Sequence, residues 1–106
     1  MRILLDECVD QRLRLLFVGH ACETAGYAKL AGLKNGALLD AAEGAGFEVL
    51  VTTDQAIPHQ QNLAKRQISI LILCGPSNRL AELRNLIPAA LVALDELAPG
   101  RVIRIE

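Results

Sequence analysis

The sequence predicts an α/β protein in which helices cover both faces of a mostly parallel sheet of four or five strands, giving a three-layer α/β/α sandwich. Short runs of Ile, Leu and Val alternate with stretches whose apolar residues recur at helical spacing, and this alternation is typical of such folds. Hydrophobic residues make up 52% of the chain but aromatic residues only 3%. Aliphatic side chains must therefore form the core, as they do around strands buried on both faces. A chain of 106 residues fits a single domain, residues 1–106.

Five short segments have the composition of strands. Four of them are rich in Leu, Ile or Val, the second is a shorter segment of mixed composition, and Gly, Pro or polar residues lie at or near their ends. They cover residues 2–5, 20–24, 47–53, 67–74 and 101–105. Ser69 is the polar residue that interrupts the fourth, so this strand is expected to be buried, and the fifth is expected to close the sheet as an edge strand.

Helical spacing predicts the segments between the strands. The first helix is expected to begin after Asp10 as its N-cap and to stop at Gly19. Asn35 is the expected N-cap of the second helix, and a short helix is expected over residues 60–66. The last helical segment runs over residues 80–97, where Pro88 either kinks it or begins a second helix.

The apolar residues of this last segment form more than one stripe. They include Ile87, Ala89, Ala90, Val92 and Ala93. A domain this small has little other helix to cover them, so we expect a homodimer or a complex with a partner protein.

Composition limits the classes of function. The formal net charge is −1, so no global field attracts nucleic acid or anionic lipid, and RNA binding would need a local basic rim. Candidates for such a rim are Lys29, Lys34, Lys65, Arg66 and Arg79, which are otherwise ordinary surface residues. Three widely spaced cysteines argue against a disulfide framework and a zinc site. No segment has the pattern of a secretion signal or a membrane span, so we expect a cytoplasmic protein without membrane contact.

Acidic residues follow two of the predicted strands. Asp6 and Glu7 come after the first strand, and Asp54 comes after the third. Parallel sheets bind ligands at the carboxyl ends of their strands, and a hard divalent cation needs converging anionic oxygens. Such acids also occur simply because helix N-termini favour negative charge. Together they predict a carboxylate site at one edge of the sheet.

Two further groups are candidates for this site. Asp40 and Glu43 lie one turn apart on the second helix, where they are either a third source of carboxylate or a solvated helix face. Ser77 and Asn78 follow the fourth strand, where they either bind phosphate or cap the next helix.

An ordered set of short strings gives the chain a resemblance to a known family. The strings are Leu4-Leu5-Asp6-Glu7, Gly19-His20, Gly32-Leu33-Lys34-Asn35-Gly36, Leu50-Val51-Thr52-Thr53-Asp54 and Gln60-Gln61-Asn62-Leu63, with Asn78 and Pro99-Gly100 after them. The set spans nearly the whole chain and resembles the small bacterial PIN-like proteins. Many of these are described as the toxins of toxin–antitoxin pairs, and PIN nucleases are metal-dependent ribonucleases.

The resemblance implies roles for particular residues. Asp6 and Asp54 would be the catalytic carboxylates and, with Glu7, would hold Mg²⁺ or Mn²⁺. Asn35 stands where related sequences often have Asp, so Asn35 or Asp40 would complete the metal site. Gln60, Gln61, Asn62 and Asn78 would contact the substrate, single-stranded RNA. A cognate antitoxin would be the protein partner.

Two other functions remain open. A catalytically silent PIN-like module would use the fold to bind a partner. A phosphoryl-accepting receiver domain also has acids after its first strand and an Asp after its third. Receivers keep a Lys after the fifth strand, followed by a helix, whereas here the fifth strand closes the sequence and contains Arg101 and Arg104.

Overall fold

The computed structural model describes residues 1–57, 63 and 65–106 of the chain. In chain order the described elements are β1 (Arg2–Leu5), the 3-10 helix η1 (Gln11–Leu16), β2 (Ala21–Thr24), α1 (Asn35–Gly44), β3 (Val49–Thr52), β4 (Ser69–Leu73), α3 (Leu80–Arg84), α4 (Ile87–Asp95) and β5 (Val102–Ile105).

The strands form one sheet in the order β2-β1-β3-β4-β5, and every neighbouring pair is parallel. Ile3 of β1 aligns with Cys22 of β2 on one side and Val49 of β3 on the other. From β1 the chain therefore goes to β2 on one flank of β1, and it then crosses back to form β3 on the other flank. This reversal creates a switch point between β1 and β3, which is where open α/β sheets form a crevice.

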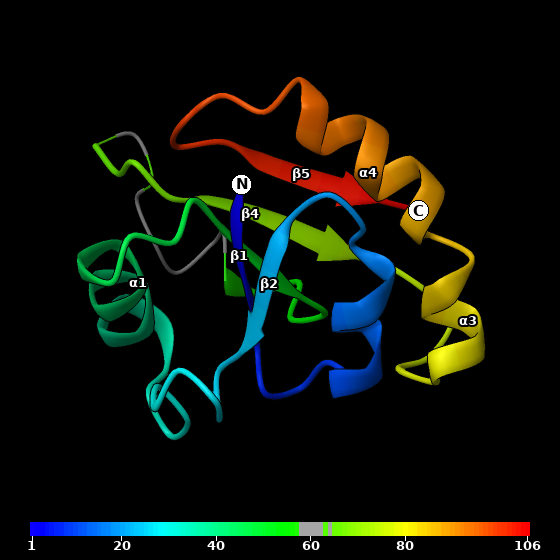
Figure 1. The fold of residues 1–106 in the computed structure, drawn as a ribbon, viewed down its shortest axis with the longest axis horizontal. Coiled ribbons are helices and arrows are strands. Elements are labelled where there is room, and N and C mark those ends of the chain that lie inside the picture. The colour runs from blue at the N-terminus through cyan, green and yellow to red at the C-terminus, as the bar shows by residue number, and fades with distance from the viewer. Residues whose placement is uncertain (58–62, 64) are drawn as a thin grey trace.

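Helices cover both faces of the sheet, so the predicted three-layer α/β/α architecture is confirmed (Figure 1). On one face Leu38, Leu39 and Ala42 of α1 pack against Leu50 and its neighbours in the sheet. On the opposite face η1, α3 and α4 pack against the alternate strand residues. Figure 1 shows the amino terminus beginning β1 inside the sheet and the carboxyl terminus following β5 at its edge.

The central strands are buried along their whole length, because both of their faces are covered. Every residue of β3 and β4 is buried. Their two polar residues, Thr52 and Ser69, are fully buried and have hydrogen-bond partners. The Ser69 hydroxyl donates to the Ala98 carbonyl at 2.7 Å and accepts the Arg101 N–H at 3.0 Å, which ties the start of β4 to the segment before β5.

The beginnings of two helices differ in how well they were predicted. Asp10 is the N-cap of η1, as expected, and its carboxylate accepts the N–H of Arg12. The N-cap of α1 is Lys34, and Asn35 is the first helical residue, so the predicted Asn35 cap is wrong. The backbone of Lys34 is extended, at φ −137° and ψ 155°, and no side-chain hydrogen bond caps this helix. The chain therefore turns into helix one residue earlier than the capping rule predicts.

The segment over residues 80–97 contains two helices. α3 ends at Arg84, and α4 begins at Ile87 with Pro88 in its first turn, where the missing N–H costs no helical hydrogen bond. Ile87 and Ala90 of α4 face the core, while Val92 is 65% exposed. Within the ranges that the structure describes, no helix has the length and apolar character needed to cross a bilayer.

The helix predicted over residues 60–66 falls mostly outside the described residues. Lys65 lies in a turn, and Arg66 lies outside any helix. The Arg66 N–H donates to the Leu63 carbonyl at 3.0 Å. The end of this segment is thus a turn that leads into β4.

Candidate functional site

The carboxyl ends of β1 and β3 bring Asp6 and Asp54 to the same cavity. The two strands are parallel neighbours, so the residues that follow them emerge at the same edge of the sheet. The cavity has a volume of about 350 Å³. It is lined by Asp6, Glu7, Cys8, Leu33, Lys34, Leu38, Thr53, Asp54, Ile57 and Asn78. The predicted placement of Asp6 and Asp54 in one crevice at the carboxyl ends of the strands is thereby confirmed, and Glu7 lines the same cavity.

Thr52 connects the two aspartates. Its hydroxyl donates to Oδ2 of Asp6 at 2.8 Å and accepts the N–H of Asp54 at 3.1 Å. Because Thr52 is fully buried at the end of β3, its hydroxyl has a fixed position. This residue was not singled out in the sequence, although it is a polar residue that ends the apolar run Val49-Leu50-Val51 and so offered a signal.

Backbone N–H groups orient all three carboxylates. The N–H of Glu7 donates to Oδ1 of Asp6 at 2.9 Å, and the N–H of Ala56 donates to Oδ1 of Asp54 at 2.9 Å. The N–H of Gly32 donates to Oε1 of Glu7 at 3.1 Å, which ties the loop before α1 to the end of β1. Hydrogen bonds of this kind hold a carboxylate in one orientation before any ligand arrives.

Cys8 and Lys34 also line the cavity; Lys34 was a candidate for the basic rim, whereas Cys8 was not predicted to take part in a site. The thiol of Cys8 lies 3.2 Å from the hydroxyl of Thr53, which donates to it, and 3.5 Å from the hydroxyl of Thr52. Lys34 brings an exposed cation to the same rim, directly before α1. The cavity thus combines carboxylates, a thiol and one ammonium group.

Asp40 and Glu43 lie elsewhere. The guanidinium of Arg66 contacts the Asp40 carboxylate at 2.8 Å and the Glu43 carboxylate at 2.7 Å. The second Glu43 oxygen accepts the N–H of Gln67 at 3.1 Å. The hydrogen bonds that Arg66 donates to Glu43 and to Asp40 raise the pKa of Arg66 above its usual value. Arg66 precedes β4, so this cluster belongs to the amino end of the sheet and is separated from Asp6 and Asp54.

The remaining predicted residues divide into three cases. Asn78 lines the cavity, while its neighbour Ser77 accepts the N–H of Arg79 and contacts the Glu82 carboxylate at the start of α3. Asn35 begins α1 next to Lys34, but its side chain is not described. The residues Gln60, Gln61 and Asn62 lie outside the described part of the chain.

The donor set suits a magnesium-type ion held by few protein ligands. Among the residues that the structure describes, no group of three or more His, Cys, Asp or Glu side chains converges as a metal site. Asp6 and Asp54 nevertheless supply two carboxylates, and each oxygen that accepts one hydrogen bond keeps a second lone pair. Mg²⁺ is commonly held by one or two carboxylates together with water and substrate phosphate.

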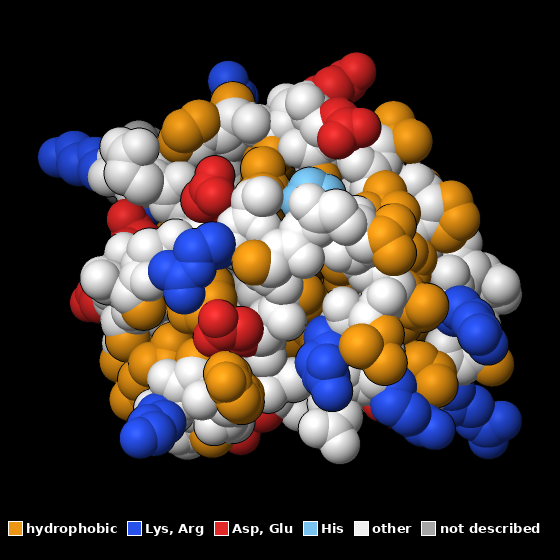
Figure 2. Space-filling model, in the orientation of Figure 1, with side chains coloured by type: hydrophobic (Ala, Val, Ile, Leu, Met, Phe, Trp, Pro, Cys, Tyr) orange, Lys and Arg blue, Asp and Glu red, His pale blue; other side chains and the backbone are white. Residues whose placement is uncertain are grey.

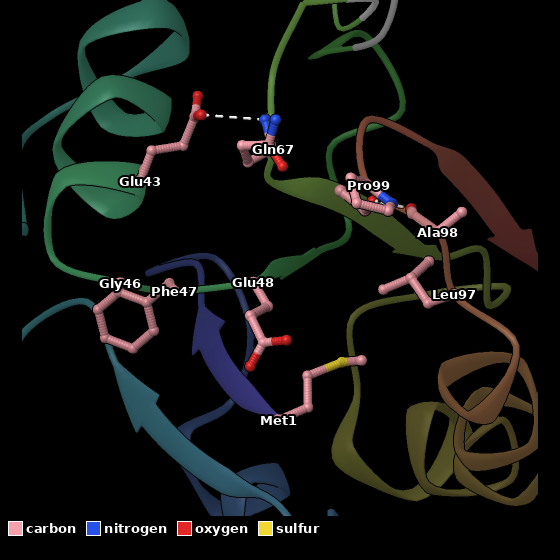
Figure 3. A pocket seen from close by; sticks show the side chains of 10 residues that line it. Met1, Glu43, Gly46, Phe47, Glu48, Gln67, Leu97, Ala98 and Pro99 are labelled. Atoms are coloured by element: carbon pink, nitrogen blue, oxygen red, sulfur yellow. Dashed lines mark hydrogen bonds between the residues drawn. The ribbon is translucent and has the colours of Figure 1, made fainter.

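A second cavity lies at the amino end of the sheet and has a different character (Figure 3). Its volume is about 320 Å³. Figure 3 shows Glu43 bound to the backbone of Gln67, with Glu48 and Met1 on one side of the cavity and Ala98 and Pro99 on the other. One Glu48 oxygen accepts the N–H of Arg2 at 3.0 Å. Its carboxylates therefore serve the fold, and the carboxyl-end cavity, which holds Asp6 and Asp54, is the better candidate of the two.

Comparison of the chain with protein-family models, with curated proteins and with solved structures gave no match. Function is therefore inferred from the site.

Proposed function

We propose that the protein is a metal-dependent ribonuclease of the PIN-like type. The observation that carries the proposal is the pair of carboxylates, Asp6 and Asp54, in one cavity at the switch point between β1 and β3. The Thr52 hydroxyl connects the Asp6 carboxylate to the backbone N–H of Asp54. Two oriented carboxylates beside a basic residue favour phosphoryl chemistry on an anionic substrate.

In this proposal Asp6 and Asp54 hold Mg²⁺ or Mn²⁺, and Glu7 lies beside them. The bound ion would polarise the scissile phosphate and lower the pKa of the attacking water. Thr52 and the N–H groups of Glu7 and Ala56 keep the carboxylates oriented, so little rearrangement is needed when the ion binds. The protein's contribution is thus mainly the positioning of charge.

Positive charge near the cavity supports a phosphate-containing substrate. Lys34 lines the cavity, and α1 begins at the next residue, where a helix N-terminus attracts anions. Basic side chains also gather on the side of the molecule where η1 and α3 lie, whereas acidic ones are scattered over the rest of the face in view (Figure 2). This local basic surface compensates for the overall charge of −1.

The sparse aromatic content favours single-stranded RNA bound through its backbone. Unpaired RNA exposes its phosphates and sugars, and specific recognition usually adds stacking on aromatic rings. The single tyrosine, Tyr27, is 79% exposed and lines a cavity beside β2 instead of the carboxylate cavity. We therefore expect weak sequence preference. The resemblance to the small bacterial PIN-like proteins also makes a cognate antitoxin the expected protein partner.

The test compares wild type with Asp6→Asn and Asp54→Asn, which keep the shape of the side chains and remove their charge. Wild type should cleave unstructured RNA with Mn²⁺ or Mg²⁺, and its Tm should rise when Mn²⁺ is added, because a ligand stabilises the state that binds it. Both variants should lose the cleavage and the Tm rise. Asp95→Asn on exposed α4 is the matched control and should retain both.

Equal cleavage by wild type and both variants would contradict the assignment of the site. The absence of both cleavage and metal-induced stabilisation in wild type would favour a silent binding module.

One observation also favours a phosphoryl-accepting receiver. The strand order β2-β1-β3-β4-β5 is the order of flavodoxin-like folds, which include receivers, and Asp54 follows β3 as the acceptor would. Incubation with a small acyl phosphate and Mg²⁺ distinguishes the two functions. A gain in mass of one phosphoryl group, lost in Asp54→Asn, would support the receiver, and an unchanged mass would oppose it.

A further inference from the structure

One edge of the sheet presents unpaired backbone groups. Within the described chain, β2 pairs with β1 alone. The N–H groups of Ala21 and Ala25 point toward β1, where they donate to the carbonyls of Met1 and Leu5. Because successive residues of a strand alternate in direction, the N–H groups of Cys22 and Thr24 point away from the sheet. An edge of this kind can pair with another strand.

The surface beside this edge is hollowed and partly apolar. A cavity of about 600 Å³ follows the edge. It is lined by Gln11, Arg14, Cys22, Glu23, Thr24, Gly26 and Tyr27. Large apolar side chains in and near this region are strongly exposed, namely Leu15 at 65%, Val18 at 69% and Tyr27 at 79%. An interface here would cover both the polar edge and these side chains.

We propose that β2 is the interface of a homodimer, in which two copies of β2 pair in antiparallel orientation around a two-fold axis that places Cys22 opposite Cys22 of the second copy. In this register the N–H and carbonyl of Cys22 exchange two hydrogen bonds with the same groups of the second copy. Thr24 lies opposite His20 of the second copy, so its outward N–H meets a carbonyl. The Thr24 carbonyl and the His20 N–H already have partners within the chain, Ala28 and Phe17, so the self-complementary groups are the N–H and carbonyl of Cys22 and the N–H of Thr24.

The side chains select this register. A two-fold axis through Glu23 would instead place two carboxylates directly opposite each other, which is unfavourable. Cys22 is small and uncharged, and burial raises the pKa of its thiol to about 12. Two such side chains can lie side by side without charge repulsion.

Charge complementarity supports a second copy as the occupant. Glu23 lies 3.8 Å from Arg2 of β1 in the same chain. Ala21 aligns with Arg2 in the sheet, and in the proposed register Ala21 faces Glu23 of the second copy. Each Glu23 would therefore approach Arg2 of the other chain. The opposite edge strand, β5, carries Arg101 and Arg104 beside or within it, and these like charges oppose self-pairing.

The first experiment measures association by sedimentation equilibrium across micromolar concentrations. Wild type should form a dimer, and Glu23→Lys should weaken it by about tenfold or more, because an attraction to Arg2 becomes a repulsion. Glu96→Lys makes the same charge change on an exposed residue away from β2 and should leave the dissociation constant within about twofold. A monomer at every concentration, or equal dimerisation by all three proteins, would overturn the proposal.

The second experiment needs no variant. Amide hydrogen exchange by NMR should become slower at Cys22 and Thr24 as wild-type concentration rises, since these N–H groups gain partners only in the dimer. Val102 and Arg104 of β5, whose N–H groups point away from β4 by the same alternation, are the internal control and should not respond. Protection at Val102 and Arg104 instead of Cys22 and Thr24 would assign the interface to the wrong edge and reject the proposal.

Discussion

At the level of single residues, Thr52 determines the geometry of the candidate site. It is fully buried, and one hydroxyl serves both aspartates, as donor to Asp6 and as acceptor from the N–H of Asp54. Valine has nearly the same shape but no hydroxyl. Replacing Thr52 with Val therefore separates the effect of the hydroxyl from the effect of side-chain packing.

Thr52→Val should lower the free energy of unfolding by about 1–3 kcal/mol, because two part-buried hydrogen bonds, from the Thr52 hydroxyl to Asp6 and from the N–H of Asp54 to that hydroxyl, are lost. It should also reduce the Mn²⁺-induced rise in Tm. Thr52→Ser keeps the hydroxyl and should retain most of the metal response. Urea unfolding and thermal melts with and without Mn²⁺ measure both effects. A full metal response in Thr52→Val would mean that Thr52 does not position the carboxylates.

The acids of the site could be predicted because strand ends can be read from local apolar runs. Asp6 and Asp54 come directly after two of the predicted strands. Because β1 and β3 pair in parallel, the two residues emerge at the same edge of the sheet. Asp40 could not be assigned in this way, since its partner Arg66 is 26 residues away in sequence. Lys34 was one of five candidates for a basic rim and Cys8 was given no role, because their place in the cavity depends on how two loops fold back over the strand ends.

At the level of elements, η1 depends on its cap. Asp10 accepts the N–H of Arg12 at 2.9 Å and also binds the Arg12 side chain, and these hydrogen bonds lower the pKa of Asp10 to about 2 from 3.8. A carboxyl whose pKa is lower in the folded protein stabilises the fold above its unfolded pKa. That stabilisation is lost as the pH falls through the folded value.

Asp10→Asn should therefore be less stable than wild type at pH 7, and the difference should shrink as the pH falls from about 4 towards 2. Asp10→Ala also removes the cap acceptor, so it should be less stable than Asp10→Asn at every pH in this series. Thermal melts at a series of pH values measure the differences. A difference between wild type and Asp10→Asn that grows on acidification would contradict the assignment.

Gly100 joins the segment before β5 to the turn before β4. Its φ is +71°, and a Cβ there would lie 2.8 Å from the Leu63 carbonyl oxygen and 2.9 Å from that of Arg66. Gly100→Ala should cost about 1–3 kcal/mol through backbone strain and this close approach. Gly26→Ala is the control, because a Cβ there meets nothing within 4 Å and the φ is not positive. Urea denaturation of both variants tests the difference, and equal stabilities would rule out the close approach.

The element predictions were accurate where one local signal dominated. Four of the strands follow from apolar runs, β2 has no such run, and all five observed strands of the described chain lie within the predicted segments. The break between α3 and α4 was left open because a proline is compatible with both a kink and a first turn. The position of Lys34 as N-cap could not be predicted, since Asn is the better capping residue and only the path of the preceding loop decides between them.

Across the whole molecule, Arg66 ties one helical layer to the sheet. Its guanidinium lies between Asp40 and Glu43 of α1, and its own backbone leads into β4. Arg66→Gln should lower Tm, because two carboxylates on one helix face lose the cation between them. Added salt should recover part of the loss by screening their repulsion. Lys65→Gln removes the neighbouring exposed charge and should change little. Equal Tm values for the two variants would show that the tie is not needed.

An all-parallel sheet covered on both faces also determines where the sequence is free to change. β3 and β4 are buried at every position, so neither face offers a site where substitution is neutral. β2 and β5 retain exposed or half-buried positions. New binding properties can therefore arise in the loops at the two ends of the sheet, on its outer strands and on the exposed faces of the helices, but not on β3 and β4. In a library of single substitutions we expect continuous intolerance along β3 and β4, and a patchwork of tolerated positions along β2 and β5.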